Sequence, residues 1–386
     1  MTTPYPEPLL PHDGEVVSPG GFLGGPAEPG WIATQRERGC RVGRVVVVSR
    51  GFDTVRYEDG TEELTDRSTA AFRAAALDGP PAVGDWVGVV RDGSSPAIVA
   101  VAPRRGVIVR RDPADRLTAQ VVAANVDTVL CVFGLDRPLR PRRVERVLVL
   151  VHEGGASPVV VLTKGDLDDL APDRPETATA LIHRLAPSVP VHVVSSRTGA
   201  GLDGLAAYLG SGSTVALLGE SGAGKSSLVN ALVGTSEAEV GTVRDRDRRG
   251  RHTTTVRRLF ALPGGASLID TPGLRSLGLW DAADGVDEAF PDVAGHAEGC
   301  RFRDCRHEDE PDCAVRAAAE AGALPPARLT AYRSLRAEVD LVEIRREAGR
   351  RRRGEGRRPP LRRARRRADV DHDEDDSDDT GGGDRY

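Results

Sequence analysis

The stretch GESGAGKSS, residues 219–227, decides which class of fold this chain adopts. It matches the pattern G-x-x-x-x-G-K-[ST] at Gly219, Gly224, Lys225 and Ser226, between an apolar strand-like run and a helical one. Glycines let backbone N–H groups turn inward around a phosphate, and the following helix adds its positive end. A glycine turn that caps an ordinary helix is the alternative. The flanking strand and helix favour a phosphate-binding loop.

The composition limits the class of protein. A chain of 386 residues is long enough for two or three domains, and a hydrophobic fraction of 39% is ordinary for a soluble protein. The first forty residues lack a basic stretch followed by an apolar one, and no apolar run has the length needed to cross a bilayer. We therefore expect a cytoplasmic protein without a signal peptide or a membrane span.

The formal net charge of −5 conceals two oppositely charged segments near the C-terminus. Residues 345–367 are densely basic with arginine, and residues 369–379 form an acidic run. Arginine blocks commonly bind nucleic acid, whereas the alternative is a solvated tail whose two halves neutralise each other. The pattern alone leaves both open.

Three patterns follow one another along the chain. Residues 1–37 are rich in Pro and Gly without apolar periodicity, which predicts a flexible segment. From Arg41 to about Arg104, short strands separated by Gly and Asp turns predict a small β-barrel, which either binds oligonucleotides or only fills its own core. From Val121 to Leu279, apolar strands alternate with helical segments. This alternation predicts a mostly parallel sheet with helices on both faces.

Lysine is nearly absent from this chain, which directs attention to the two that remain. Of the 53 basic residues only Lys164 and Lys225 are lysine. A lysine kept in such a chain is expected to act as a compact ammonium ion, which a planar guanidinium does not imitate. Lys225 belongs to the phosphate loop, and Lys164 belongs to TKGDL, residues 163–167, directly after the apolar run SPVVVL.

TKGDL resembles the N/T-K-x-D guanine motif of GTPases. Guanine offers its N1–H and 2-amino donors, and the Asp166 carboxylate can accept from both, whereas adenine would leave that carboxylate unpaired. Lys164 is expected to pack along the loop and the base, and Thr163 stands where asparagine is commoner. A solvated turn between a strand and a helix is the alternative, and the scarcity of lysine disfavours it.

A second segment of this kind follows the next predicted strand. VSSRTGAGL, residues 194–202, resembles the GTPase segment whose backbone N–H contacts the guanine O6 atom. Ser195, Ser196 and Arg197 are the positions concerned. Loops rich in Ser and Gly are common, so the interpretation depends on the position of this segment after TKGDL.

The motif DTPG, residues 270–273, follows the phosphate loop and ends a predicted strand. Asp270 is expected to hold a water bound to Mg²⁺, and the Gly273 backbone N–H to sense the γ-phosphate. In the phosphate loop, Lys225 would reach the β- and γ-phosphates and the Ser226 hydroxyl would ligate Mg²⁺.

The polar segment GRHTTT, residues 250–255, is a candidate switch. One of its three threonines should complete the Mg²⁺ shell, and we take Thr254 as that residue. Leu274 follows DTPG, where many GTPases place a glutamine that orients the attacking water. We therefore expect slow intrinsic hydrolysis and hypothesise that His252 holds the water, the alternative being a histidine that only packs within the switch.

The stretch CRFRDCRHEDEPDC places Cys300, Cys305, His307 and Cys313 at the spacing C-x4-C-x-H-x5-C. Three of the five cysteines thus lie within fourteen residues of a chain without a secretion signal, which favours metal over disulfides. Three thiolates and one imidazole make a closed tetrahedral zinc site of the structural type. The other two cysteines lie in apolar strands and are expected to be buried thiols.

The order of the motifs is the most specific feature of the sequence. The base-reading motifs TKGDL and SSR precede the phosphate loop and DTPG follows it, whereas a usual GTPase begins with the phosphate loop. The domain is therefore expected to be circularly permuted. With the small barrel, GRHTTT and the cysteine cluster, the chain resembles the RsgA family (also called YjeQ) over roughly residues 40–345.

The resemblance implies an OB-fold barrel, a circularly permuted P-loop GTPase domain and a mainly helical zinc-binding domain. It implies a GTPase that binds GTP and GDP, the 30S ribosomal subunit and its 16S rRNA, and that assists late maturation of the subunit. Hydrolysis would be stimulated by the subunit and coupled to release, with Leu274 as the hydrophobic substitute for glutamine. We expect a monomer with one structural Zn²⁺, and Mg²⁺ beside GTP.

The expected domains are a flexible segment 1–37, an OB-fold barrel 38–105, a GTPase domain 106–283, a zinc-binding domain 284–345 and a disordered, basic then acidic tail 346–386. The expected catalytic residues are His252, Lys225, Asp270 and Gly273, and the expected magnesium ligands are Ser226, Thr254 and Asp270. The expected GTP contacts are Thr163, Lys164, Gly165, Asp166, Ser195, Ser196, Arg197, Gly219, Glu220, Ser221, Gly222, Ala223, Gly224, Lys225, Ser226 and Ser227.

Three alternatives stay open. A P-loop ATPase is disfavoured by TKGDL. Another permuted ribosome-assembly GTPase is not expected to combine a barrel in front with this cysteine cluster behind. An RNA-binding scaffold whose nucleotide site only locks its shape is compatible with Leu274, because turnover without a partner could be negligible.

Overall fold

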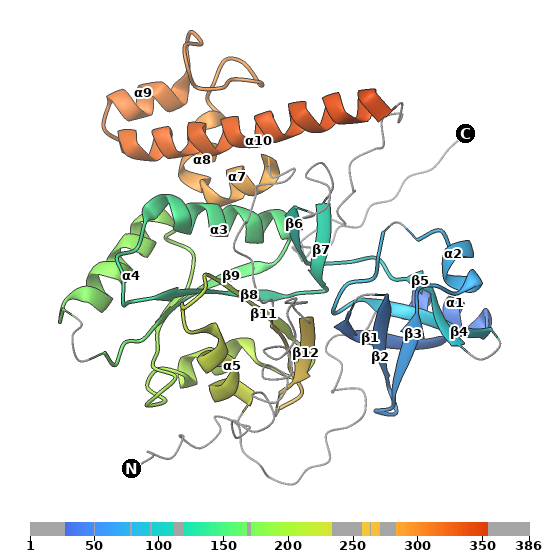
Figure 1. The fold of residues 1–386 in the computed structure, drawn as a ribbon. Helices are drawn as coiled ribbons and strands as arrows, with labels where there is room; N and C mark the ends of the chain where they lie inside the picture. Colours follow the sequence, from blue (N-terminus) through green and yellow to red (C-terminus); the bar gives the residue numbers. More distant parts are fainter. Residues whose placement is uncertain are drawn as a thin grey trace, which may run out of the picture. The chain divides into compact units, whose positions relative to one another are not determined.

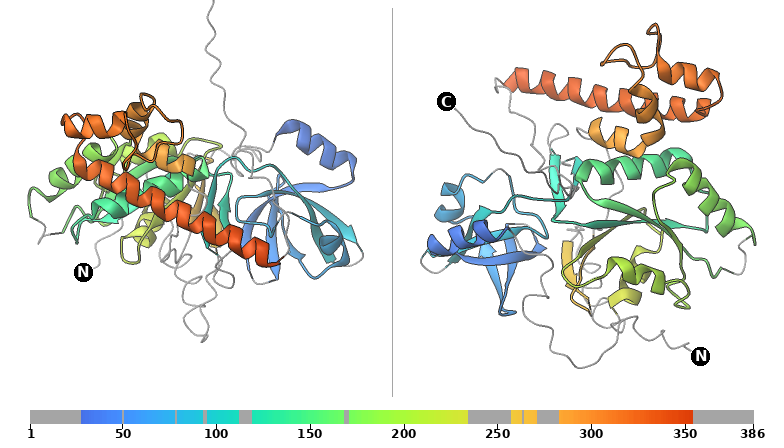
Figure 2. Two further views of the ribbon diagram at one scale, coloured as in Figure 1. Left: turned by 90° about the horizontal axis from the view of Figure 1, so that it is seen from above. Right: turned by 180° about the vertical axis from the view of Figure 1, so that it is seen from behind.

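The computed structural model describes residues 28–353 apart from residues 50, 78, 93–94, 112–118, 168–170, 234–256, 263 and 271–282. Within these residues, Figures 1 and 2 show a small antiparallel sheet, a larger sheet with helices on its faces, and a group of helices late in the chain. These are the three parts of the fold class that the sequence predicts.

The small sheet contains all five strands expected between Arg41 and Arg104. They are β1 (Arg41–Val48), β2 (Phe52–Tyr57), β3 (Glu62–Asp66), β4 (Trp86–Asp92) and β5 (Ser95–Val101). They pair antiparallel in the order β3-β2-β1-β4-β5, and β3 also contacts β5, so the sheet curls around its own core. Val45, Tyr57 and Ile98 are buried in that core. A short helix, α2 (Ala70–Ala74), follows β3.

A helix lies where the Pro- and Gly-rich composition predicted a flexible segment. α1 (Pro29–Glu37) begins with Pro29, whose fixed φ suits the first helical turn, where no N–H donor is needed. Trp31 and Ile32 of α1 pack against Trp86 of β4. Two large apolar side chains therefore anchor a helix whose sequence shows little periodicity.

The larger sheet confirms the mostly parallel arrangement predicted from the alternating pattern. Its strands, in spatial order, are β10 (Val191–Val193), β9 (Ser157–Thr163), β8 (Thr128–Gly134), β11 (Thr214–Gly219), β13 (Ser267–Asp270) and β12 (Arg257–Ala261). The first five are parallel, and β12 runs antiparallel to β13 and pairs on its other side with β1 of the small sheet. The carboxyl ends of the parallel strands therefore lie at one edge of the sheet.

Helices cover both faces of the larger sheet (Figure 1). They are α3 (Pro141–Gly154) and α4 (Arg174–Leu185) on one face and α5 (Lys225–Val233) on the other. Alternate residues of β8 serve the two faces: Cys131 and Phe133 join the core under α3 and α4, whereas Leu130 and Val132 join the core under α5. Burial on both faces explains the uninterrupted apolar run of this strand.

Two details refine the sequence expectation. The segment LDGLAAYLG, residues 202–210, forms one of the helical segments of the alternating pattern, as a short 3₁₀ helix, η2 (Asp203–Tyr208). A separate two-stranded hairpin that the sequence did not predict, β6 (Val107–Arg111) with β7 (Ala119–Ala124), lies at the start of the expected GTPase domain. In both segments the local pattern is short, which leaves tertiary packing to decide the structure.

The helical region late in the chain consists of α7 (Ala283–Ala289), α8 (Pro291–Ala297), α9 (Ala314–Glu320) and α10 (Pro326–Arg353). α10 continues eight residues beyond position 345, into the arginine block. Arginine, glutamate and alanine are good helix formers, so this composition extends the helix. Within the described residues, none of the helices has the length and apolar character that crossing a membrane would need.

A buried arginine joins the small sheet to the larger one. Arg44 of β1 is fully buried, and its Nη2 donates to the Thr214 hydroxyl at 2.9 Å and its Nε to the Gly84 carbonyl at 3.1 Å. Burial lowers the pKa of Arg44 to about 10, against the opposing charge of Asp127, so the guanidinium stays charged at neutral pH. Thr214 begins β11, the strand that leads to the phosphate loop.

We expect Arg44→Ala to lower the free energy of unfolding by about 3 kcal/mol, because it leaves a cavity and removes the buried donor to the Thr214 hydroxyl. Urea unfolding followed by circular dichroism measures this change. Arg36→Ala is the control, since the Arg36–Glu58 ion pair is 62% and 66% exposed and contributes little. Equal stability of the two variants would contradict the role of Arg44.

Candidate functional site

The phosphate loop connects β11 to α5 in the expected way. Gly222 and Gly224 adopt positive φ values of 80° and 91°, which favour glycine. A Cβ atom on Gly219 would lie 2.4 Å from the Val132 carbonyl oxygen, so only glycine fits beside β8. The Lys225 ammonium donates to the Gly219 carbonyl at 2.6 Å and is thereby held across the loop.

The TKGD segment at the end of β9 lies against the phosphate loop. The buried Thr163 hydroxyl donates to the Ala223 carbonyl of the loop at 2.5 Å and approaches the Phe133 carbonyl at 3.3 Å. A Cβ atom on Gly224 would lie 3.1 Å from the same hydroxyl. Threonine at the place of the commoner asparagine therefore ties the two motifs together directly.

Lys164 is oriented by a carboxylate that sequence reasoning missed. Its φ is 65°, an unusual value for a residue other than glycine, and its ammonium pairs with Asp136 Oδ2 at 2.8 Å. Burial acts to raise the pKa of Asp136, but hydrogen bonds from Lys164 and Arg137 lower it overall. Asp136 follows β8 closely. Its position just after a predicted strand is the sequence feature that could have identified it as part of the site.

The second base-reading segment lies beside the first. The Gly165 backbone N–H donates to the Val194 carbonyl at 3.2 Å, and Arg197 Nε donates to Asp166 Oδ2 at 2.5 Å. The buried Ser195 hydroxyl accepts from the Arg197 backbone N–H at 3.2 Å and so shapes the turn that carries Ser196. Burial acts to raise the pKa of Asp166, but hydrogen bonds from Ser195 and Arg197 keep it below its usual value. Asp166 is therefore an ionised acceptor at neutral pH.

The strand end that carries Asp270 lies beside the phosphate loop. Asp270 pairs in parallel register with Leu217 of β11, two residues before Gly219. Ser226 is exposed in the first turn of α5. The other predicted residues of this part, namely His252, Thr254, Gly273 and Leu274, lie outside the described residues.

Arginines from α3 and from the loop that precedes it also reach the phosphate loop, and the sequence motifs did not identify them. Arg143 pairs with the Glu220 carboxylate at 2.6 Å. The guanidinium of Arg137 lies 3.3 Å from the place where a Cβ atom on Gly222 would be. Single arginines carry little signal in a chain so rich in them, so this contact becomes visible only in three dimensions.

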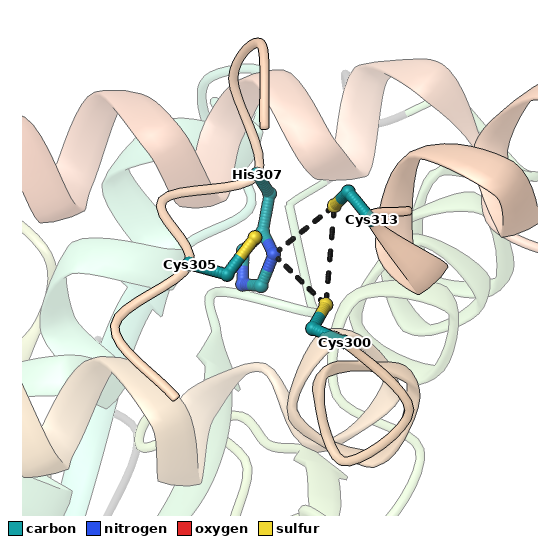
Figure 3. A group of neighbouring side chains, drawn as sticks. All are labelled: Cys300, Cys305, His307 and Cys313. Carbon is teal, nitrogen blue, oxygen red and sulfur yellow. Dashed lines mark hydrogen bonds between the residues drawn. The ribbon is translucent and has the colours of Figure 1, made fainter. Parts of the chain in front are cut away.

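The four predicted metal ligands lie together in the helical region (Figure 3). The Nδ1 atom of His307 lies 3.6 Å from the Cys300 sulfur and 3.5 Å from the Cys313 sulfur, and those two sulfurs lie 3.9 Å apart. All four ligand atoms, including the Cys305 sulfur, lie within 4.8 Å of one another. A tetrahedral zinc ion would separate two sulfurs by about 3.8 Å and a sulfur and a nitrogen by about 3.5 Å. The cluster therefore fits a metal and suggests zinc.

The loop between Cys305 and Cys313 is shaped to present its ligands. His307 has a φ of 62°, and the Glu310 carboxylate accepts from the Arg306 and Glu308 backbone N–H groups, each at 2.8 Å. Burial lowers the pKa of His307, which favours the neutral imidazole that binds a metal.

The sheet, the phosphate loop and the base-reading segments that precede it in the chain define a class: a circularly permuted P-loop GTPase with a Cys₃His cluster behind it. A family model described as RsgA GTPase matches residues 101–280. The chain is 47% identical to "Small ribosomal subunit biogenesis GTPase RsgA" of Streptomyces coelicolor, over 82% of this chain and 85% of that protein. The corresponding protein of Syntrophotalea carbinolica is 44% identical over 77% of this chain and 82% of its own length. The chain belongs to the RsgA family.

Two solved structures share the fold. YjeQ from Thermotoga maritima is 28% identical, with a TM-score of 0.59 over 78% of this chain and 98% of that chain. YloQ, described as a circularly permuted GTPase, is 24% identical, with a TM-score of 0.55 over 78% of this chain and 95% of that chain. The expected family, fold class and GTPase class are therefore confirmed.

We expect Cys313→Ser to lose bound zinc, because the three ligands that remain hold the ion far less tightly than four. Metal analysis of the purified protein should find about one zinc per wild-type chain and almost none in the variant. Cys131→Ser, in a buried strand outside the cluster, should keep its zinc. Wild-type protein without zinc would refute the assignment.

We expect Asp166→Asn to weaken GTP binding about a hundredfold, because the asparagine amide does not accept both guanine donors. The variant should instead prefer xanthosine triphosphate, whose C2 carbonyl can accept from the amide. Competition against a fluorescent nucleotide measures both affinities. Asp173→Asn, an exposed change in the same domain, should leave them unaltered.

Proposed function

We propose that this protein is a GTPase that binds the small (30S) ribosomal subunit, assists its late maturation, and hydrolyses GTP to GDP and phosphate with stimulation by the subunit. The observation that carries the proposal is the bond between the Thr163 hydroxyl and the Ala223 carbonyl. It joins a guanine-type motif to a phosphate loop in a chain 47% identical to a protein named for small-subunit biogenesis. Since ribosomal subunits mature in the cytoplasm, we propose that the protein acts there, as a monomer.

The base would be read at the edge where β9 and β10 end. Asp166 would accept from the guanine N1–H and 2-amino groups, and the backbone after Ser195 would face the O6 atom. Lys164 would lie along the base plane, oriented by Asp136. The low pKa of Asp166 supports this role, because an ionised carboxylate accepts but does not donate.

The phosphates would lie over the loop from Gly219 to Ser227. Backbone N–H groups and the Lys225 ammonium would hold the β- and γ-phosphates. Mg²⁺, when bound, neutralises charge that develops on these phosphates. Ser226, Thr254 and Asp270 are the residues that would hold the ion, and the exposed Ser226 hydroxyl and the carboxylate at the end of β13 are oxygen donors of the kind Mg²⁺ prefers.

Hydrolysis would need help, since Leu274 offers no hydrogen bond to water. We propose that His252 orients the attacking water, and that the Gly273 backbone N–H senses the γ-phosphate. Binding of the subunit would bring His252 into position against that water, which would account for the stimulation.

The remaining domains would recognise the subunit. We propose an OB-fold barrel over residues 38–105 and a zinc-binding domain over residues 284–345, both bound to 16S rRNA, around a GTPase domain over residues 106–283. One Zn²⁺ held by the Cys₃His cluster would fix the loop between α8 and α9. The segments 1–37 and 346–386 would flank this unit.

The deciding measurement is phosphate release from GTP and from ATP, each with and without purified 30S subunits. We expect the subunits to raise turnover of GTP about tenfold or more and to leave ATP unaffected. His252→Ala should lose most of the stimulation, and subunits should bind more tightly with a non-hydrolysable GTP analogue than with GDP. Tight GTP binding with a flat response would favour the scaffold alternative.

A further inference from the structure

The junction of β8 and α3 is unusually basic: five of the ten residues from 137 to 146 are arginine. α3 has Arg140 at its N-cap position and no acidic residue in its first turn. The positive end of a helix dipole favours acidic residues there, so arginines at this place disfavour the helix. An arrangement that opposes local stability points to a function for these side chains.

Three of these arginines line one pocket beside the phosphate loop. Arg137, Arg140 and Arg143 surround it together with Glu220. Arg143 pairs with Glu220 at 2.6 Å, and Arg137 pairs with Asp136 at 3.2 Å. Arg140 is exposed, and in the described part of the chain its side chain has no ion pair. Positive charge is therefore concentrated in one place and only partly neutralised.

We propose that Arg137, Arg140 and Arg143 form a phosphate-binding surface, the α3 arginine patch, for the RNA backbone of the small ribosomal subunit. The inference rests on the proposed function, which supplies the RNA. Guanidinium groups bind phosphate oxygens through paired N–H donors. Arg137 and Arg143 are 48% and 40% exposed, and a row of exposed arginines suits a repeating polyanion better than a single enclosed anion.

The α3 arginine patch shares a carboxylate with the nucleotide site. Glu220 is the second residue of the phosphate loop, and its backbone carbonyl accepts from the Lys225 ammonium at 2.7 Å. A backbone phosphate that binds Arg143 competes with the Glu220 carboxylate for the same guanidinium. Contact with RNA would therefore release the carboxylate of Glu220, the residue whose backbone carbonyl holds Lys225. In this way the patch links subunit binding to the phosphate loop.

The helix that carries most of the α3 arginine patch is held in place by ion pairs with α10. Glu145 of α3 pairs with Arg328 of α10 at 3.0 Å, and both side chains are almost fully buried. Arg146 of α3 pairs with Glu338 of α10. Because α3 is anchored in this way, its arginines are positioned before RNA arrives, and less freedom is lost on binding.

Arg140→Glu is the direct test, because Arg140 lies outside the residues proposed to hold the nucleotide. Affinity for purified 30S subunits is measured with a saturating non-hydrolysable GTP analogue at several KCl concentrations. We expect about tenfold weaker binding at low salt and a slope of log Kd against log salt that falls by about one. GTP affinity without subunits should be unchanged. Arg184→Glu, the same change at an exposed position of α4, should keep the wild-type affinity and slope.

Glu220→Gln tests the competition. Without the carboxylate, Arg143 is free for RNA, so the variant should bind 30S subunits about threefold more tightly, whereas a purely structural Glu220 predicts equal or weaker binding. That equal or weaker result would overturn the link to the phosphate loop.

Wild-type affinity and slope for Arg140→Glu would overturn the patch and leave the proposed function standing. Failure of the wild-type protein to bind 30S subunits would overturn the proposed function, and this inference with it.

Discussion

The nucleotide site depends on one constraint, the parallel pairing of β9 and β11 on either side of β8. Parallel strands bring their carboxyl ends to one edge, so the loops that follow β9 and β11 lie one strand apart. The Thr163 hydroxyl at the end of β9 connects the two loops by donating to the Ala223 carbonyl of the phosphate loop. The constraint concerns the order of strands in space. A chain that begins and ends elsewhere in the sequence can therefore build the same edge, which is why the permutation leaves the site intact.

Much of this arrangement could be predicted from the sequence, because its signals are local. The phosphate loop and the Cys₃His cluster depend on spacing within a few residues, and the strands of the sheet are apolar runs of a typical length. Asp136 and Arg143 could not be predicted in this way. Glu220, the partner of Arg143, is 77 positions away, and one arginine among so many carries no local signal. The switch residues lie outside the described residues, so their roles stay predictions.

α3 connects the parts of the molecule that carry different chemistry. One side of the helix reaches the phosphate loop through Arg143, and another reaches α10 through Glu145. Arg328 donates to the Glu145 carboxylate and also to Asp292 of α8, the latter at 2.9 Å, and its guanidinium lies over the Phe290 ring. α8 leads directly to Cys300. A buried guanidinium with this many partners strongly opposes separation of the helices, because any separation would leave it unpaired.

The seam between the two sheets is short. Among the residues that the structure describes, β1 and β12 pair through Val47 with Arg258 and through Val48 with Arg257. In the sequence, the candidate switch, residues 250–255, directly precedes β12. Because this seam is short, a displacement of β12 would reach the small sheet through these two residue pairs, beside the buried bond between Arg44 and Thr214.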